Sequence, residues 1–152
     1  MGKETKRGEE LGYVIRPARL QDRAAISRLL AQTWPDYEFD PDRVLNYIVA
    51  QNSRNVVGAI YCSRILNALH IFDLVVRQDL RGQGIAAALI SKAEELAREK
   101  GLDSIHITAD ITDNDTRLVD YYTSLGFTLI KGTKNRLVKD VATIPSTGDL
   151  NS

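Results

Sequence analysis

The sequence is poor in cysteine and has no excess of charge of either sign. Cys62 is the single cysteine among 152 residues, which excludes a disulfide within the chain and fits a reducing compartment. Lysine and arginine together number 20, as do aspartate and glutamate, so the net charge is zero. Proteins that bind nucleic acids usually have more basic than acidic residues on one face, so we expect no nucleic-acid partner.

Long apolar runs are also missing. No stretch approaches the roughly 20 apolar residues of a membrane-spanning helix. The first residues, MGKETKRGEE, contain no apolar signal core. We therefore expect a cytoplasmic protein with no membrane partner. The chain is 43% hydrophobic, which at this length is sufficient for one domain with a buried core.

The two ends of the chain are polar and rich in turn-forming residues. We expect residues 1–11 and 142–152 to be disordered, and residues 12–141 to form one folded domain. Apolar patterning predicts strands at 13–18, 47–51, 56–64, 69–76, 104–109, 127–131 and 136–141. Helical spacing predicts helices at 20–34, 85–100 and 113–127, with a short one near 42–46.

The order of these elements predicts the fold class. The first half reads as antiparallel strands, whereas helix 85–100 connects strand 69–76 to strand 104–109, which should therefore lie parallel. This predicts an α/β (α+β) fold, a mixed seven-stranded sheet with three to four helices. We expect Asp22 in the first turn of the first helix, and Asn114 or Asp115 near the start of the last.

Two glycines precede helix 85–100, in the stretch RGQGIA at 81–86, here called the glycine turn. A helix start offers unpaired N–H groups and a positive dipole end, and Gly82 and Gly84 would let these N–H groups approach a phosphate closely. Arg81 would add a charge. A flexible loop is the competing interpretation. Dinucleotide binding, with Asp110 on the ribose, is a poorer match because too few βα units remain.

The stretch LVVRQDLRGQGIAAALI and the later DYYTSLGF together resemble the GNAT superfamily of N-acetyltransferases. The cofactor motif of that family, [QR]-x-x-G-x-[GA], is matched by Arg81, Gly84 and Ala86, and the resemblance covers Tyr13 to Val141. It implies the GNAT fold, in which the central parallel strands splay apart, and acetyl-CoA as co-substrate. No metal is expected, and a homodimer is left open.

The resemblance also implies where acetyl-CoA would bind. Its pyrophosphate would lie on the glycine turn and its pantetheine arm between strands 69–76 and 104–109. Asp115 stands where many members have asparagine. The cofactor-binding residues expected on this basis are Leu74, Val75, Val76, Arg81, Gly82, Gln83, Gly84, Ile85, Ala86 and Asp115.

Acetyl transfer to an amine needs a base for the amine and an acid for the departing thiolate. Tyr122 matches the family's tyrosine in YYTSLGF and is the expected acid; its neighbour Tyr121 should point elsewhere and pack. Asp73 interrupts an apolar strand and is the expected base, unless it only bonds a neighbouring strand or loop. His70 and His106 are the alternative bases.

Two acidic segments, WPDYEFDPD and ADITDND, flank the expected acceptor pocket. Carboxylates with aromatic rings suit a cation, which predicts Trp34, Tyr37, Glu38 and Asp110 as substrate-binding residues. The acceptor would then be a cationic amine such as a polyamine, a lysine side chain or a basic peptide end. An ordinary solvated acidic loop is the competing interpretation of these segments.

For the protein as a whole, a non-catalytic acyl-CoA-binding sensor is the alternative function.

Overall fold

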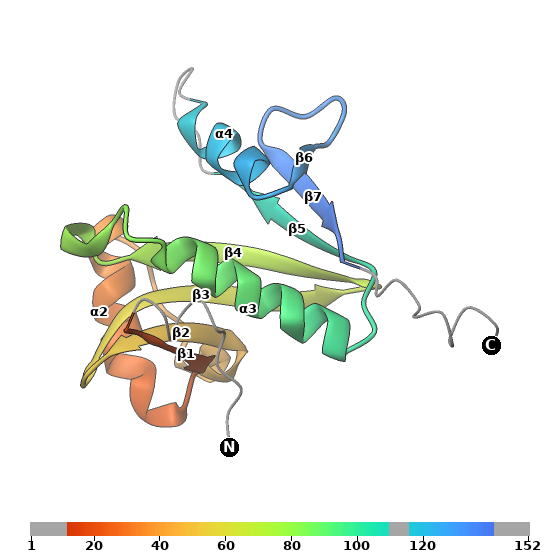
Figure 1. Ribbon diagram of the computed structural model, residues 1–152. Helices are drawn as coiled ribbons and strands as arrows, with labels where there is room; N and C mark the ends of the chain where they lie inside the picture. The colour runs from red at the N-terminus through yellow and green to blue at the C-terminus, as the bar shows by residue number, and fades with distance from the viewer. Residues whose placement is uncertain (1–11, 110–115, 142–152) are drawn as a thin grey trace.

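The computed structural model describes residues 12–109 and 116–141, which form a seven-stranded sheet in the order β1-β2-β3-β4-β5-β7-β6 (Figure 1). Only the β4–β5 pair is parallel, and the other neighbours in this sheet are antiparallel. The predicted fold class is confirmed. The strands are β1 (Val14–Pro17), β2 (Tyr47–Asn52), β3 (Asn55–Ile65), β4 (Ala68–Val76), β5 (Ser104–Thr108), β6 (Thr128–Leu129) and β7 (Arg136–Asp140).

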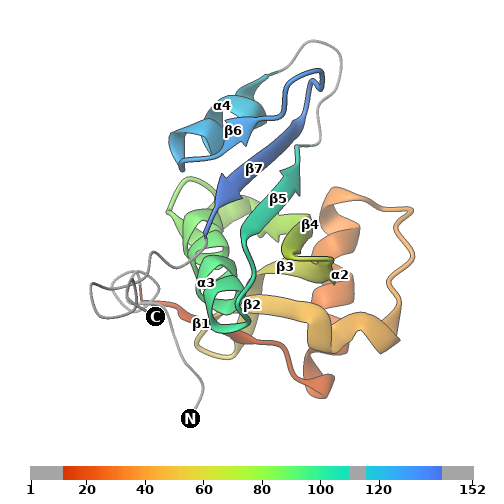
Figure 2. The same cartoon turned by 90° about the vertical axis from the view of Figure 1, so that its right-hand side faces the viewer.

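Helices cover both faces of the sheet. The α-helices are α2 (Arg23–Thr33), α3 (Ile85–Glu99) and α4 (Arg117–Ser124), and short 3-10 helices are η1 (Leu20–Asp22), η2 (Pro41–Asn46) and η3 (Gln78–Leu80). Figure 2 shows α2 and α3 on opposite sides of the central strands. The main core forms between α3 and the sheet, and a smaller one forms between α2 and strands β2, β3 and β4.

The first helix begins differently from the sequence prediction. The chain makes the 3-10 turn η1 at Leu20, and the α-helix starts only at Arg23. Asp22, expected in the first turn, is buried and accepts hydrogen bonds from Arg16 at 2.8 and 3.1 Å and from the Arg19 N–H at 2.7 Å. Burial alone would raise the pKa of Asp22, but these bonds and the Arg16 charge bring it below its usual value.

Strands β4 and β5 separate halfway along β4, as the resemblance implied. Their paired residues end at Ile71 opposite Ile107, while β4 continues to Val76 beside β3. Within this second half, Asp73 and Leu74 lie opposite one residue of β3, which is a β-bulge. Asp73 has a φ of +56°, in the left-handed region. The bulge re-aims the end of β4 and leaves an opening beside it.

The C-terminal elements are shorter than predicted. Helix α4 begins at Arg117, after Thr116, and the predicted start at 113–115 lies outside the described residues. Strand β6 contains only Thr128 and Leu129, because only these two residues pair with β7. The chain ends 1–11 and 142–152 also lie outside the described residues, so their expected disorder stays a prediction. Among the residues described, no helix has the length and apolar character that crossing a membrane requires.

The buried Arg16–Asp22 pair makes a prediction about stability. We expect Asp22→Ala to lower the free energy of unfolding by about 3–5 kcal/mol, because Arg16 is left buried without its counter-charge. Urea unfolding at pH 7 measures this. The folded-state pKa of Asp22 is lowered, so its stabilisation is complete above the ordinary value of 3.8 and is lost as the pH falls further.

Asp40→Ala is the matched control for this variant. Asp40 pairs with Arg43 at 3.5 Å in solvent and accepts the Asp42 N–H, so its loss should cost only about 1 kcal/mol. Equal losses in the two variants would contradict the special role given to the buried pair.

Candidate functional site

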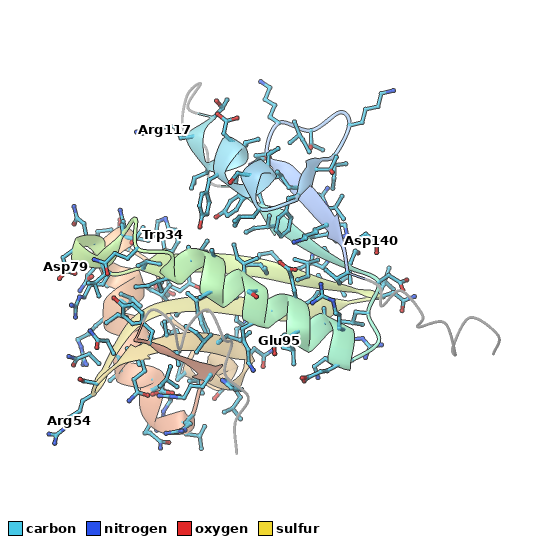
Figure 3. The ribbon with its side chains drawn as sticks, in the orientation of Figure 1. Trp34, Arg54, Asp79, Glu95, Arg117 and Asp140 are labelled. Carbon is cyan, nitrogen blue, oxygen red and sulfur yellow. The ribbon has the colours of Figure 1, made fainter. Side chains whose placement is uncertain are left out.

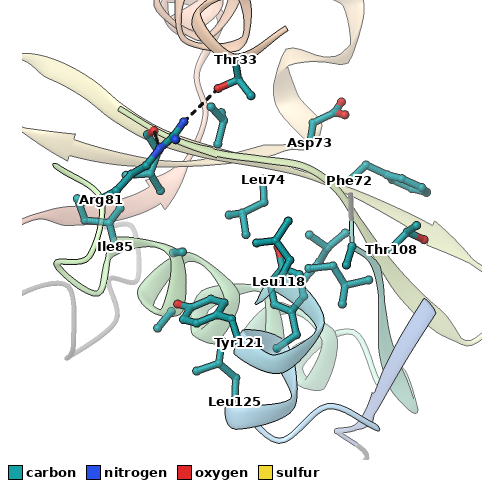
Figure 4. A pocket seen from close by; sticks show the side chains of 18 of the residues that line it. Thr33, Phe72, Asp73, Leu74, Arg81, Ile85, Thr108, Leu118, Tyr121 and Leu125 are labelled. Carbon is teal, nitrogen blue, oxygen red and sulfur yellow. Dashed lines mark hydrogen bonds between the residues drawn. The ribbon is translucent and has the colours of Figure 1, made fainter. Parts of the chain in front are cut away.

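A cavity of about 1100 Å³ fills the opening between β4 and β5 (Figure 4). Its walls come from the two strands, the glycine turn, α3, α4 and the end of α2. It brings together most of the site residues expected from the sequence, namely Trp34, Tyr37, Asp73, Leu74, Val75, Val76, Arg81, Gly82, Gly84, Ile85, Ala86 and Tyr122.

Four expected site residues do not line the part of the cavity that the structure describes. Glu38 is exposed in solvent outside the cavity. Gln83 is also outside, and its side-chain oxygen accepts a hydrogen bond from the Tyr13 hydroxyl at 3.0 Å. Asp110 and Asp115 lie outside the described residues, so their expected roles stay predictions.

The glycine turn has the backbone that an anion site requires. Gly82 and Gly84 have φ values of +81° and +85°, which other residues rarely adopt, and Gly84 is the N-cap of α3. The first hydrogen bond of the helix runs from the Ala88 N–H to the Gly84 carbonyl at 3.0 Å. The N–H groups of Ile85 to Ala87 precede this bond and have no acceptor within the helix. The turn can therefore bind a phosphate-like anion at the cavity wall.

Arg81 extends along the cavity mouth in Figure 4. Its Nε donates to the Val76 carbonyl at 3.2 Å and its guanidinium also donates to the Thr33 hydroxyl at 3.4 Å. The side chain thus adds positive charge beside the glycine turn. The Val76 carbonyl, which we expect to bond a ligand arm, already accepts one hydrogen bond, and its second lone pair can accept another.

Asp73 is the one carboxylate that lines the described part of this cavity. The Tyr37 hydroxyl donates to its Oδ2 at 2.5 Å, and Tyr37 also shares a side-chain hydrogen bond with Tyr47. Burial and the bond to Asp73 raise the pKa of Tyr37, so this phenol stays protonated and continues to donate. The segment after α2 therefore holds Asp73 by a hydrogen bond, and the residue also lines the cavity. Its role as a base stays a prediction.

Both tyrosines of α4 line the cavity. Tyr122 is buried, with 4% of its surface exposed, and its ring meets the edge of Phe127 at 6.3 Å between centroids. The expectation that Tyr121 points elsewhere is wrong: it is half-buried on the cavity wall, where Figure 4 labels it. The two tyrosines line the cavity together because Leu118, Tyr121, Tyr122 and Leu125 have the spacing of one helix face.

The two histidines lie away from the described cavity wall. His70 and His106 are register partners across β4 and β5, and their rings stack with centroids 4.7 Å apart. Burial lowers the pKa of both imidazoles, so both are neutral at pH 7. Neither is in place to act as a base in the cavity.

The acidic segment after α2 gives the cavity aromatic rings rather than carboxylates. Trp34 and Tyr37 line the wall, with ring centroids 6.2 Å apart. Asp36 is exposed outside the cavity, and Asp40 instead caps η2 and pairs with Arg43. For this segment the expected acidic wall is thus corrected to two aromatic rings beside Asp73, while the aspartates at 110, 113 and 115 of the second segment lie outside the described residues.

Sequence reasoning missed several lining residues. Leu118 and Leu125 lie on the same face of α4 as Tyr121 and Tyr122, and their helical spacing is the signal that could have found them. Asn135 also lines the cavity, where its side-chain amide donates to the Ala109 carbonyl at 2.9 Å. Asn135 lies in a polar turn, and nothing in the neighbouring sequence indicates that it lines a cavity.

Comparison with known proteins gives one family for most of this chain. A sequence model described as the Acetyltransferase (GNAT) family matches residues 6–127. An acetyltransferase of Pectobacterium atrosepticum is 34% identical over 91 residues, which cover 57% of this chain and 64% of that protein, just under two thirds of its length. One of Sodalis glossinidius is 34% identical over 97 residues, covering 60% of this chain and 68% of the relative.

Solved structures share the fold at lower identity. An aminoglycoside 6′-N-acetyltransferase complexed with coenzyme A superposes with a TM-score of 0.76 at 17% identity, covering 88% of this chain and 99% of that one. The PaiA N-acetyltransferase of Thermoplasma acidophilum, also in complex with coenzyme A, gives 0.70 at 15% identity, covering 84% and 98%. At these identities the likeness supports the fold.

Proposed function

The chain belongs to the Acetyltransferase (GNAT) family, and on this basis we propose that it transfers the acetyl group of acetyl-CoA, as co-substrate, to a primary amine by direct attack in a ternary complex. The observation that carries this proposal is the cavity between β4 and β5, here called the main cavity. One cavity joins an anion-binding glycine turn to a wall with a carboxylate and three phenols. A donor and an acceptor can therefore meet inside it.

On the donor side, the glycine turn would hold the pyrophosphate of coenzyme A through the N–H groups at the start of α3. Arg81 would add charge, and the free edge of β4 at Leu74 and Val76 would bond the pantetheine arm. The support is geometric: within the described residues, β4 pairs with no strand on the β5 side beyond Ile71, so its backbone groups there can bond an extended ligand.

In the reaction, we assign Asp73 as the base and Tyr122 as the acid. Asp73 accepts a proton from the attacking amine as the new C–N bond forms. Tyr122 donates its phenolic proton to the sulfur as the C–S bond breaks, since a thiol is a better leaving group than a thiolate. A backbone N–H near Val75 would stabilise the charge on the carbonyl oxygen.

For the acceptor, we propose an amine that carries further positive charge, such as a polyamine, a lysine side chain or a basic peptide amine. Trp34 and Tyr37 offer ring faces for a cation, and Asp73 offers the counter-charge. A thiol-release assay with acetyl-CoA tests this on spermidine, lysine, an aminoglycoside, a basic peptide and a neutral peptide amine. Tight coenzyme A binding without turnover on any amine would instead favour a non-catalytic sensor.

The glycine turn predicts an effect on cofactor affinity. We expect Gly84→Val to weaken coenzyme A binding at least about tenfold, because a side chain would strain the backbone and cover the anion site. Isothermal titration calorimetry measures this. Gly132→Val is the matched control: Gly132 has a φ of +86°, in a turn away from the cavity, so the same strain should leave the affinity unchanged. A similar loss in both variants would contradict the assignment.

The acid assignment predicts a difference between adjacent tyrosines. We expect Tyr122→Phe to lower kcat about 100-fold or more, with little change in coenzyme A affinity, because the sulfur then leaves without a proton. Tyr121→Phe, on the same wall, should lower kcat only a few-fold. Steady-state kinetics of both variants measures this. If Tyr121→Phe has the larger effect, Tyr121 is the acid and the assignment is wrong.

The base assignment predicts a change in the pH profile. Asp73→Asn keeps a residue type that tolerates the left-handed backbone and can still accept the Tyr37 hydrogen bond. We expect kcat/KM to fall about 100-fold and the acid limb of its pH profile to disappear. Thermal unfolding checks that the bulge is intact. An acid limb that persists in a folded Asp73→Asn enzyme would remove Asp73 as the base.

A further inference from the structure

A second cavity, of about 540 Å³, lies between the C-terminal half of α3 and the sheet. It shares no lining residue with the main cavity in the part of the chain that the structure describes. Its floor is apolar, formed by residues such as Ile48, Leu69 and Leu96. Its volume falls in the range of small-molecule sites, which are mostly apolar with a few placed polar groups.

A buried lysine provides the polar group of this cavity. Lys92 lines it with only 8% of its side chain exposed, on the helix face that meets the sheet. Its ammonium has a long contact of 3.8 Å with Glu95, which Figure 3 labels on the same stretch of α3. Lysine is almost never this buried without a close partner, because removing its charge from water is costly. The contact to Glu95 is longer than a hydrogen bond, so a ligand carboxylate in the cavity could pair with this ammonium more closely.

The charges around the opening favour an anion. Arg64 and Lys100 also line the second cavity, with a single carboxylate, Glu99, on its wall. The Arg64 Nε donates to the nearby Leu66 carbonyl, which directs the guanidinium stem without neutralising its charge. Among the described lining residues, three cations stand against one carboxylate, and Glu95 beside Lys92 adds a second carboxylate, so the net charge over the apolar floor stays positive.

We propose that the second cavity is a binding site for a small carboxylic acid with an apolar body. The carboxylate would pair with Lys92, supported by Arg64 and Lys100, and the hydrocarbon would cover the apolar floor. This site is separate from acetyl transfer, and a ligand here would contact the same helix whose first turn borders the main cavity.

Calorimetric titration of octanoate into the coenzyme A-saturated protein tests the proposal. Under the proposed function, coenzyme A would occupy the donor side of the main cavity, and the Lys92 variants below separate binding at the second cavity from binding at the acceptor side. We expect a Kd of about 1 mM or tighter for octanoate. Octylamine has the same hydrocarbon body with a positive charge, so it should bind at least about tenfold more weakly. Absence of octanoate binding, or equal binding of octylamine, would overturn the proposal.

Variants of the buried lysine locate the site. Lys92→Met should weaken octanoate binding at least about tenfold, and Lys92→Arg should retain it. Lys131→Met removes an exposed lysine that lines neither cavity and should leave the affinity unchanged. Unchanged affinity for coenzyme A in each variant shows an intact fold. Octanoate affinity within twofold of wild type in a folded Lys92→Met protein would place its binding elsewhere and refute the site.

Discussion

The separation of β4 from β5 is the constraint on which the rest of this molecule depends. A continuous parallel ladder would close the sheet and leave no room for a ligand. The bulge at Asp73 and Leu74 redirects β4 after Ile71, and the strand then follows β3 alone. The same backbone turn places the Asp73 side chain beside Tyr37. One local irregularity therefore creates the main cavity, a free strand edge and the position of its only described carboxylate.

Much of the fold was predictable because its signals are local. Apolar periodicity predicts the hairpin of β2 and β3 and helix α3. The glycine turn follows from glycines, which adopt a positive φ without strain. The burial of Asp22 was not predicted, because its partner Arg16 belongs to another element and helix propensity does not reveal a tertiary ion pair. The same limit explains the acidic segment after α2, where charge composition could not show that its rings, rather than its carboxylates, face the cavity.

Helix α3 has two surfaces with different uses. Helix α3 begins at the glycine turn, where its first backbone N–H groups face the main cavity. Its C-terminal half covers the second cavity. Between them, Leu89 and Ala93 pack into the main core without exposed surface. A helix buried this firmly moves as a unit, so both cavities share one rigid wall.

The parallel pairing of β4 and β5 is also short, with only four register pairs, from Ala68–Ser104 to Ile71–Ile107. Among the described strands, this ladder is the one place where the antiparallel first half of the sheet joins β5, β7 and β6. The sheet thus has a larger leaf, β1 to β4, and a smaller leaf, β5 with β7 and β6, which in the described part of the chain pair with each other only along these four residue pairs and are otherwise joined through the main core. Backbone amide hydrogens of the smaller leaf should exchange with solvent through local opening, before the larger leaf unfolds. A ligand that contacts both leaves binds only the closed form and would therefore slow that exchange.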